Sequence, residues 1–162
     1  MAQPREADGR YRQSALSLKR EFPDYCKFPR FRAAEPGSVT TEVSMKYMLL
    51  IYGDETALNE SEREACYVES TQLAQEIKSK GQYLAANPLY PTASATSVRM
   101  REGKRLVTDG PFAETREQLG GYFLIDARDL DEAIGVATRI PMARKGTVEI
   151  RPVIEIAGLP AG

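Results

Sequence analysis

The chain has no histidine among its 162 residues. It therefore lacks the side chain most used for proton transfer near neutral pH, which is also the commonest metal ligand. Ser-His-Asp and Cys-His catalytic sites and the HExxH zinc motif are all excluded. This single absence narrows the chemistry of the chain more than any motif that is present.

Cysteines and long apolar runs are also scarce. Cys26 and Cys66 form no CxxC unit and imply neither a disulfide framework nor a zinc site, so a reducing cytoplasm is the expected location. No run approaches the roughly 18 apolar residues that span a bilayer, and residues 1–20 contain no apolar core of a secretory signal. The formal net charge of −1 suggests no nucleic-acid partner. We expect no membrane contact, no metal and no cofactor.

The character of the chain changes near Met45. Residues 1–44 hold eight Lys/Arg, six Asp/Glu, four Pro and no Ile, and no strand or helix period runs through them. This composition predicts a weakly ordered N-terminal extension. Two alternatives stay open: biological translation starts at Met45, or the stretch "KFPRFR" docks on a partner. We expect one domain over residues 45–156 and a short tail over 157–162.

The first half of this domain predicts a strand, a helix and a hairpin. "MKYMLLIY" is typical of a strand buried on both faces. A helix over 60–80 follows, with Asn59-x-x-Glu62 and Ser61-x-x-Glu64 both able to form a capping box and Gly81 as its stop. "AANPLYPTA" predicts a Pro-bounded loop, and "SATSVRMREGKRLVTDG" predicts a hairpin that turns at Glu102-Gly103. The inward face of the helix is expected to comprise Cys66, Leu73 and Ile77, with Ala65 and Ala74 beside them.

The second half predicts a strand, a helix and a last strand. "GYFLIDA" is a second doubly apolar strand, and "GTVEIRPVIEI" alternates cleanly. Between them, "RDLDEAIGVATRI" predicts a helix with Ile134, Ala137 and Ile140 inward and Pro141 as its stop. The resulting order βαββαβ predicts an α+β fold of the ferredoxin-like type, an antiparallel sheet with two helices on one face.

The other face of that sheet has no cover within the chain. The strands at Tyr47–Tyr52 and Tyr122–Ile125 carry apolar residues on both sides. An apolar face of roughly 15–20 Å each way would be a liability in water. We therefore expect a homodimer with sheet against sheet.

The stretch "VTDGPFAETREQLGGYF" is the candidate functional loop. Asp109 precedes Gly110-Pro111, which hold it at a strand end. As a general base its carboxyl would need a pKa about two units or more above the ordinary value of about 3.9, in a pocket made partly apolar by Phe112 and nearby tyrosines. The alternative is that Asp109 closes the corner through an Asx turn.

Other candidates are weaker signals. Arg99 and Arg101 share a strand face and can hold an anionic group, or they solubilise an exposed strand. Tyr52 lines the pocket or belongs to the core or the interface. Glu114 contributes to the site, or bonds to a strand end or to Arg116. Gly120-Gly121 indicates a close backbone approach or a bulge. The predicted ligand-binding residues are thus Tyr52, Arg99, Gly110, Pro111, Phe112 and Glu114, with Asp109 as the candidate catalytic residue.

The strings "MKYMLLIYGDE", "RLVTDGPFAETREQLGGYFLIDARDLDEAI" and "ATRIPMARKGTVEIRPV" resemble the DGPF-type branch of the YCII-related family. The resemblance runs from Met45 to about Val153. It implies a dimeric α/β barrel of ferredoxin-like units and a mostly uncharacterised function. It also implies a link to extracytoplasmic-function sigma factors, whose genes often lie beside those of DGPF-type relatives. Distant members are lyases acting on chlorinated aromatic diols through a His–Asp pair, a pattern from which this chain departs.

Two function classes follow. The first is a cofactor-free lyase or isomerase with Asp109 as acid/base and Tyr or Arg groups holding an anionic or phenolic substrate. The second is a non-catalytic protein that binds a small molecule near the loop, in an accessory or regulatory role linked to a sigma factor. The missing histidine favours the second. RNA binding on the sheet is disfavoured, because the aromatic pattern of RNA-recognition modules is missing.

Overall fold

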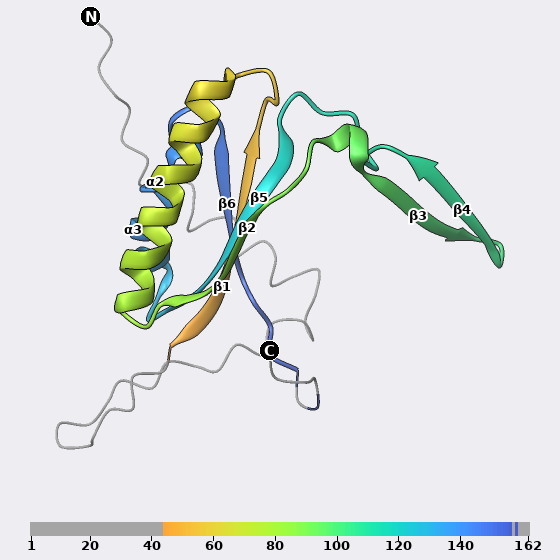
Figure 1. Ribbon diagram of the computed structural model, residues 1–162. Helices are drawn as coiled ribbons and strands as arrows, with labels where there is room; N and C mark the ends of the chain where they lie inside the picture. Colours follow the sequence, from red (N-terminus) through yellow and green to blue (C-terminus); the bar gives the residue numbers. More distant parts are fainter. Residues whose placement is uncertain (1–43, 157, 159–162) are drawn as a thin grey trace, which may run out of the picture. The chain divides into compact units, whose positions relative to one another are not determined.

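The computed structural model describes residues 44–156 and 158. The expected N-terminal extension lies outside the described residues except for residue 44, and so does the expected tail except for residue 158. Six strands, two α-helices and two short 3₁₀ helices follow in the order β1 (Met45–Gly53), α2 (Glu60–Ser79), β2 (Tyr83–Pro88), η1 (Thr92–Ser94), β3 (Thr96–Arg101), β4 (Lys104–Asp109), β5 (Gln118–Ala127), α3 (Leu130–Ala137), η2 (Pro141–Arg144) and β6 (Thr147–Pro152) (Figure 1). None of the described helices is both long and apolar enough to cross a membrane.

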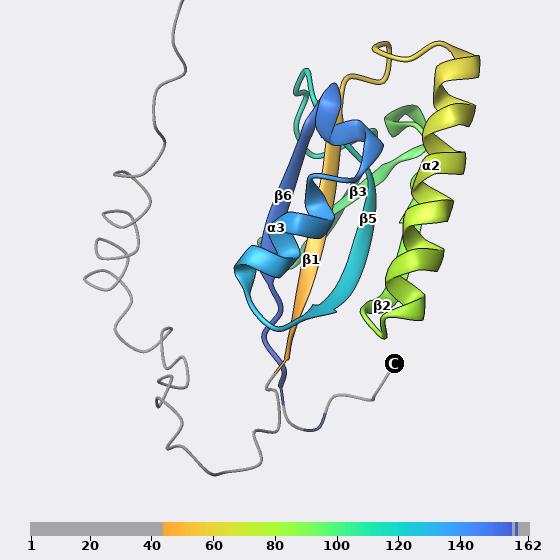
Figure 2. The ribbon, with the colours of Figure 1, turned by 90° about the vertical axis from the view of Figure 1, so that its left-hand side faces the viewer.

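Four strands form one antiparallel sheet in the order β2-β5-β1-β6. Helices α2 and α3 lie together on one face of it (Figures 1 and 2). This is the strand order of the ferredoxin-like arrangement, so the predicted α+β class is confirmed. β3 and β4 form a separate two-stranded sheet inserted between β2 and β5.

Local signals set both ends of α2. Asn59 accepts a hydrogen bond from the Glu62 amide at 2.9 Å, and the Glu62 carboxylate accepts one from the Asn59 amide at 3.0 Å. This is the first of the two predicted capping boxes. At the other end Gly81 has φ of 76°, a left-handed conformation that favours glycine. Its amide and that of Gln82 donate to the carbonyls of Lys78 and Ile77.

The core lies between the helices and the sheet. Leu49, Ile77, Ile125 and Ile140 are its largest fully buried side chains. Val148 and Ile150 of β6 pack against it, while Glu149 and Arg151 between and beyond them are exposed, as the alternation predicts.

The loop predicted over 85–93 is wrong in its first part, because residues 83–88 form strand β2. β2 is the strand that completes the sheet; the hairpin predicted from the sequence stands apart from it. "YLAANP" has few good strand formers, and pairing with β5 overrides that weak propensity. Pro88 is tolerated because it ends an edge strand.

Two expected inward positions are also wrong. Ile134 is 42% exposed, and Ala133 and Val136 are buried instead. The buried side of α3, which ends at Ala137, consists of Ala133, Val136 and Ala137. Ala65 of α2 is exposed, whereas Leu73 and Ile77 are buried as expected.

Candidate functional site

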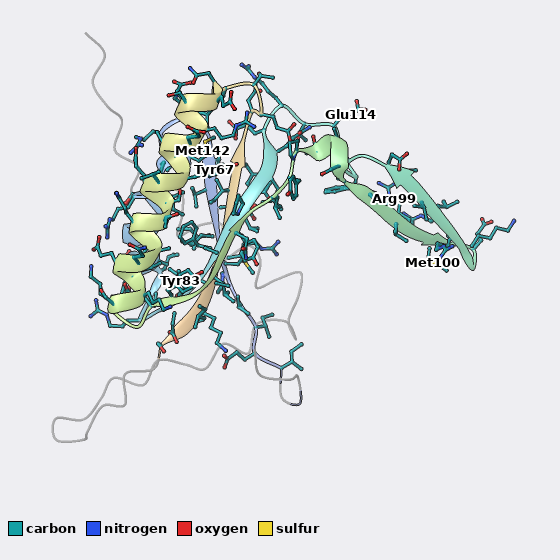
Figure 3. The ribbon with its side chains drawn as sticks, viewed as in Figure 1. Tyr67, Tyr83, Arg99, Met100, Glu114 and Met142 are labelled. Carbon is teal, nitrogen blue, oxygen red and sulfur yellow. The ribbon has the colours of Figure 1, made fainter. Side chains whose placement is uncertain are left out.

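A cavity of about 410 Å³ lies between helix α2 and the sheet, near the end of β1 from which the helix departs. Tyr67, Tyr83 and Met142, labelled in Figure 3, belong to its wall. The volume is within the usual range for a small-molecule site. The wall is mostly apolar and aromatic, and a few polar groups converge on it.

Small side chains create this space. Cys66, Ser70 and Ala74 follow one another at intervals of four on α2, so they share one face of the helix. Opposite them the sheet offers Ala86 and Gly121, which also add little volume. Where α2 presents larger residues such as Leu73 and Ile77, buried side chains fill the space between the helix and the sheet.

Uncharged polar groups border the cavity. The Asn87 side chain donates to the Tyr122 hydroxyl at 3.1 Å. The Thr92 hydroxyl donates to Gln118 Oε1 at 2.7 Å. Gln118 lines the cavity with its side chain on the helix side, whereas the Asn87 and Tyr122 side chains alternate with those of Ala86 and Phe123 and lie on the open face of the sheet. Gln118 keeps hydrogen-bonding capacity beyond its contact with Thr92, because an amide group offers two donors and two acceptor sites.

The charged groups of the wall hold the loop after β1 in place. Arg63 donates to the carbonyls of Glu55 at 3.3 Å and Leu58 at 3.5 Å. Asp54 accepts from both the hydroxyl and the amide of Thr56, and these bonds lower the pKa of its carboxyl below the ordinary value. These charges therefore serve local structure, and Asp54 stays ionised at neutral pH.

The loop between β4 and β5, residues 110–117, is called the DGPF loop below, and it forms hydrogen bonds with the β3–β4 hairpin at a place apart from the cavity. The Arg99 guanidinium donates to the Phe112 carbonyl at 3.2 Å, and the Ser97 hydroxyl donates to the Gly110 carbonyl at 2.8 Å. Gly110 has φ of 91°, which requires glycine, and its amide donates to the Ala95 carbonyl. The structure thus brings together the predicted residues Arg99, Gly110, Pro111 and Phe112 at the base of the hairpin.

The remaining predicted residues are spread out. Asp109 ends β4 opposite Thr96 and is exposed. Within the part of the chain that the structure describes, its carboxylate has no hydrogen-bond partner, so the Asx turn is not formed. Glu114 is exposed beside the hairpin base (Figure 3). The alternative of a pair between Glu114 and Arg116 is not found among the described residues, where Arg116 lies 3.6 Å from the Asp54 carboxylate.

Tyr52 lies on β1, in the other sheet. Burial, and then the neighbouring Glu149 carboxylate, raises the pKa of its phenol above 10. It is a neutral hydrogen-bonding group at physiological pH. None of the seven predicted site residues lines the cavity.

Gly120-Gly121 combines the two roles considered for it. The register with β1 passes from Gly121 to Leu119, so Gly120 is left out as a bulge. A Cβ on Gly121 would lie 3.0 Å from the Asn87 carbonyl oxygen, so this residue allows the close approach of β2.

Sequence reasoning missed the cavity residues Ser70, Asn87 and Gln118. The available signal was the run of small residues at 66, 70 and 74 on the inward side of α2, facing a glycine-rich strand. Within residues 44–156, no cluster of three or more Cys, Asp or Glu is placed to hold a metal ion.

The fold and cavity define a class of small α+β domains with a sheet covered on one face. The family model of the YCII-related domain matches residues 45–157, and the chain belongs to this family. An uncharacterised protein of Rhizobium meliloti (strain 1021) is 36% identical over 114 residues, which cover 67% of this chain and 92% of that protein.

Proposed function

We propose that this protein binds a small molecule in the cavity between α2 and the sheet, in an accessory or regulatory role. The observation that carries the proposal is a hollow of about 410 Å³ with an apolar wall and uncharged polar groups at its border. Gln118, where the DGPF loop returns to the sheet, lines this cavity, so the ligand lies near that loop and not on Asp109.

The chemistry of the wall selects the ligand class. Arg63 and Asp54 are held by internal hydrogen bonds, and a charged ligand would gain little from them. Aromatic side chains such as Tyr67 and Phe123 suit a flat apolar body. Gln118 suits a hydroxyl or carbonyl group. The ligand is therefore a neutral, mainly apolar molecule with few polar substituents.

A thermal-shift screen tests this function. The panel contains small phenols, neutral aromatic carbonyl compounds and carboxylic acids. A neutral aromatic binder at 100 times its dissociation constant stabilises the fold by about 2.7 kcal/mol. A panel in which only the carboxylic acids stabilise the fold contradicts the ligand class, and a panel with no binder contradicts the function.

The open, uncovered face of the sheet supports the proposal of a homodimer. Two sheets that pack face to face would give the dimeric α/β barrel that the resemblance implies. Leu50 and Tyr122 face each other across β1 and β5, as do Met48 and Leu124 in the next row, and all four are half-buried with no element over them. Burial of such a face against a second copy removes it from water. Sedimentation is expected to give a dimer at micromolar concentration. Leu50→Asp should give single subunits, while Val68→Asp on the exposed side of α2 should not.

The enzymatic alternative rests on Asp109. Its carboxylate is exposed at the hairpin base and has no hydrogen-bond partner within residues 44–156, which leaves it available as an acid or base. Under this hypothesis Asp109→Asn abolishes turnover of a substrate while the melting temperature stays unchanged. Turnover that survives the substitution contradicts it.

Three finer assignments belong to the same proposal. The "DGPF" string supports membership in the DGPF branch of the family, and that branch supports a link to an extracytoplasmic-function sigma factor. Both assignments fit an accessory or regulatory protein that binds a small molecule. A cytoplasmic location fits Cys66, which is a free thiol.

A further inference from the structure

The β3–β4 hairpin exposes apolar side chains that a single copy does not cover. Val98 is 61% exposed, Met100 62% and Val107 52%. Val98 pairs directly with Val107, so these side chains share one face of the ribbon with Met100. β3 and β4 make their main contacts with each other. Because an isolated two-stranded hairpin is marginally stable at best in water, this one needs a further surface to pack on.

The hairpin lies on the same side of the main sheet as the open face. Figure 1 shows it extending away from α2 and α3, and in Figure 2 it lies behind the sheet when the helices are in front. Hydrogen bonds at its base fix this direction. The Thr92 amide donates to Glu55 Oε1 at 2.7 Å, and the Arg99–Phe112 bond closes the other side. The hairpin and the open face therefore border one space.

The length of the hairpin exceeds the thickness of that space. Each of its strands has six residues, which span about 20 Å. Two sheets that pack face to face lie about 10 Å apart. An arm of this length therefore reaches past the sheet of any second copy seated on the open face.

The distribution of charge also favours a second copy of the chain as the surface on which the hairpin packs. The hairpin, residues 96–109, carries four Lys or Arg and two Asp or Glu. The rest of residues 45–156 carries ten Lys or Arg and fifteen Asp or Glu. The arm is thus cationic and the body anionic, so an arm is attracted to the body of another copy and two arms repel each other.

We propose that the β3–β4 hairpin is an arm that clasps the second copy of the chain in the homodimer. The proposal rests on the proposed dimer through the open sheet face. A two-fold axis makes the contact reciprocal, so each dimer has two arms. The Val98–Val107 face with Met100 packs on the partner, because the opposite face is occupied by Arg99 folding back on the DGPF loop. Arg105, which pairs with Met100, lies on this same face, while Arg101 and Lys104 lie on the opposite face near the end of the arm.

Matched substitutions test the energetics of the clasp. Val98→Ser removes apolar surface from the arm, and Val68→Ser makes the same change at a residue of α2 that is 58% exposed. Sedimentation equilibrium is expected to show the dimer dissociation constant raised about tenfold or more by Val98→Ser and unchanged by Val68→Ser. Equal effects of the two substitutions overturn the proposal.

A mixed-dimer experiment tests the geometry. In a Cys26→Ser, Cys66→Ser background, Lys104→Cys carries a spin label at the end of the arm. The spin-labelled protein, at natural isotope abundance, is mixed with ¹⁵N-labelled protein that carries no spin label. We expect loss of amide signal in the sheet or helices of the ¹⁵N copy, and no loss when the label is attached instead through Ser79→Cys on the helix side.

The outcomes separate the two proposals. A dimer by sedimentation without signal loss from position 104 overturns the clasp and leaves the dimer intact. A monomer at micromolar concentration overturns both. Signal loss from position 104 alone supports the clasp.

Discussion

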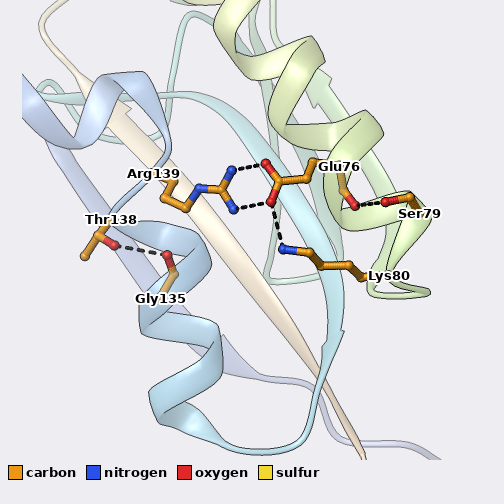
Figure 4. A network of polar contacts seen from close by, with 6 residues as sticks. All are labelled: Glu76, Ser79, Lys80, Gly135, Thr138 and Arg139. Atoms are coloured by element: carbon orange, nitrogen blue, oxygen red, sulfur yellow. Dashed lines mark hydrogen bonds and ion pairs between the residues drawn. The ribbon is translucent and has the colours of Figure 1, made fainter.

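Arg139, just after α3, donates from both terminal nitrogens of its guanidinium to the two carboxylate oxygens of Glu76 on α2 (Figure 4). Lys80 adds a hydrogen bond of 2.7 Å to the same carboxylate. The contact joins residues 63 positions apart and links the two helices that cover the sheet. It is the one place where the helix layer is held by a bidentate ion pair among the described residues.

This ion pair predicts how stability depends on pH. The Arg139 and Lys80 hydrogen bonds lower the pKa of Glu76 from 4.5 to about 2. Because the pKa of the folded state is the lower one, the stabilisation is fully present above about pH 4.5 and is lost as the pH falls towards 2. Urea unfolding of wild type and Glu76→Gln should differ at pH 6 and converge near pH 2.

The effect should be modest and sensitive to salt, since both side chains are partly exposed. Glu64→Gln is the matched control on the same helix, because Glu64 has no ion pair within residues 44–156. A difference between wild type and Glu76→Gln that stays constant from pH 6 to pH 2 would contradict the assignment.

The N-terminal cap of α2 gives a second prediction. Asn59→Ala removes the acceptor of the Glu62 amide and should lower the free energy of unfolding by about 1 kcal/mol. Ser61→Ala is the control, because the sequence offered Ser61 as a cap and the structure places it within the helix. Chemical denaturation that ranks Ser61→Ala as the more harmful change would show that the helix begins elsewhere.

Adjacent glycines of β5 should respond differently to alanine. Gly121→Ala places a Cβ 3.0 Å from the Asn87 carbonyl oxygen and 3.3 Å from Pro88 Cα, so β2 must shift. We expect a loss of about 1–3 kcal/mol of stability. Gly120→Ala meets nothing within 4 Å and should be close to neutral. Thermal unfolding of the two variants measures the contrast, and equal losses would contradict the register of β2 on β5.

Filling the cavity should abolish ligand binding without lowering the stability of the fold. Ser70→Leu places an apolar side chain in the space between α2 and the sheet, so the fold should keep its melting temperature or gain while ligand binding is lost. Ser61→Leu makes the same change on α2 outside the cavity and should leave binding intact. Calorimetric titration with the best compound from the screen distinguishes the two variants. Equal affinities would place the ligand elsewhere.

Local signals in the sequence predicted much of this fold. The Asn59–Glu62 cap, Gly81 and the Glu102-Gly103 turn each depend on neighbouring residues, and the structure confirms all three. β2 was missed because its residues become a strand only by pairing with β5, some 35 positions away.

The candidate site was harder to predict than the fold. The loop at Asp109 attracts attention because its residues are chemically active, whereas the cavity arises where side chains are small. Finding it requires knowing that Ser70 of α2 faces Gly121 of β5, and that relation depends on how the helix packs across the sheet. Local sequence does not specify such packing.

The most direct test of the proposed function is a two-dimensional ¹H–¹⁵N NMR titration with the strongest neutral aromatic compound from the screen. Our account predicts that the largest shift changes fall on amides around the cavity, such as Cys66, Ser70 and Gly121, and that Ser70→Leu abolishes them. Changes confined to the hairpin and the DGPF loop, or persisting in Ser70→Leu, would contradict it.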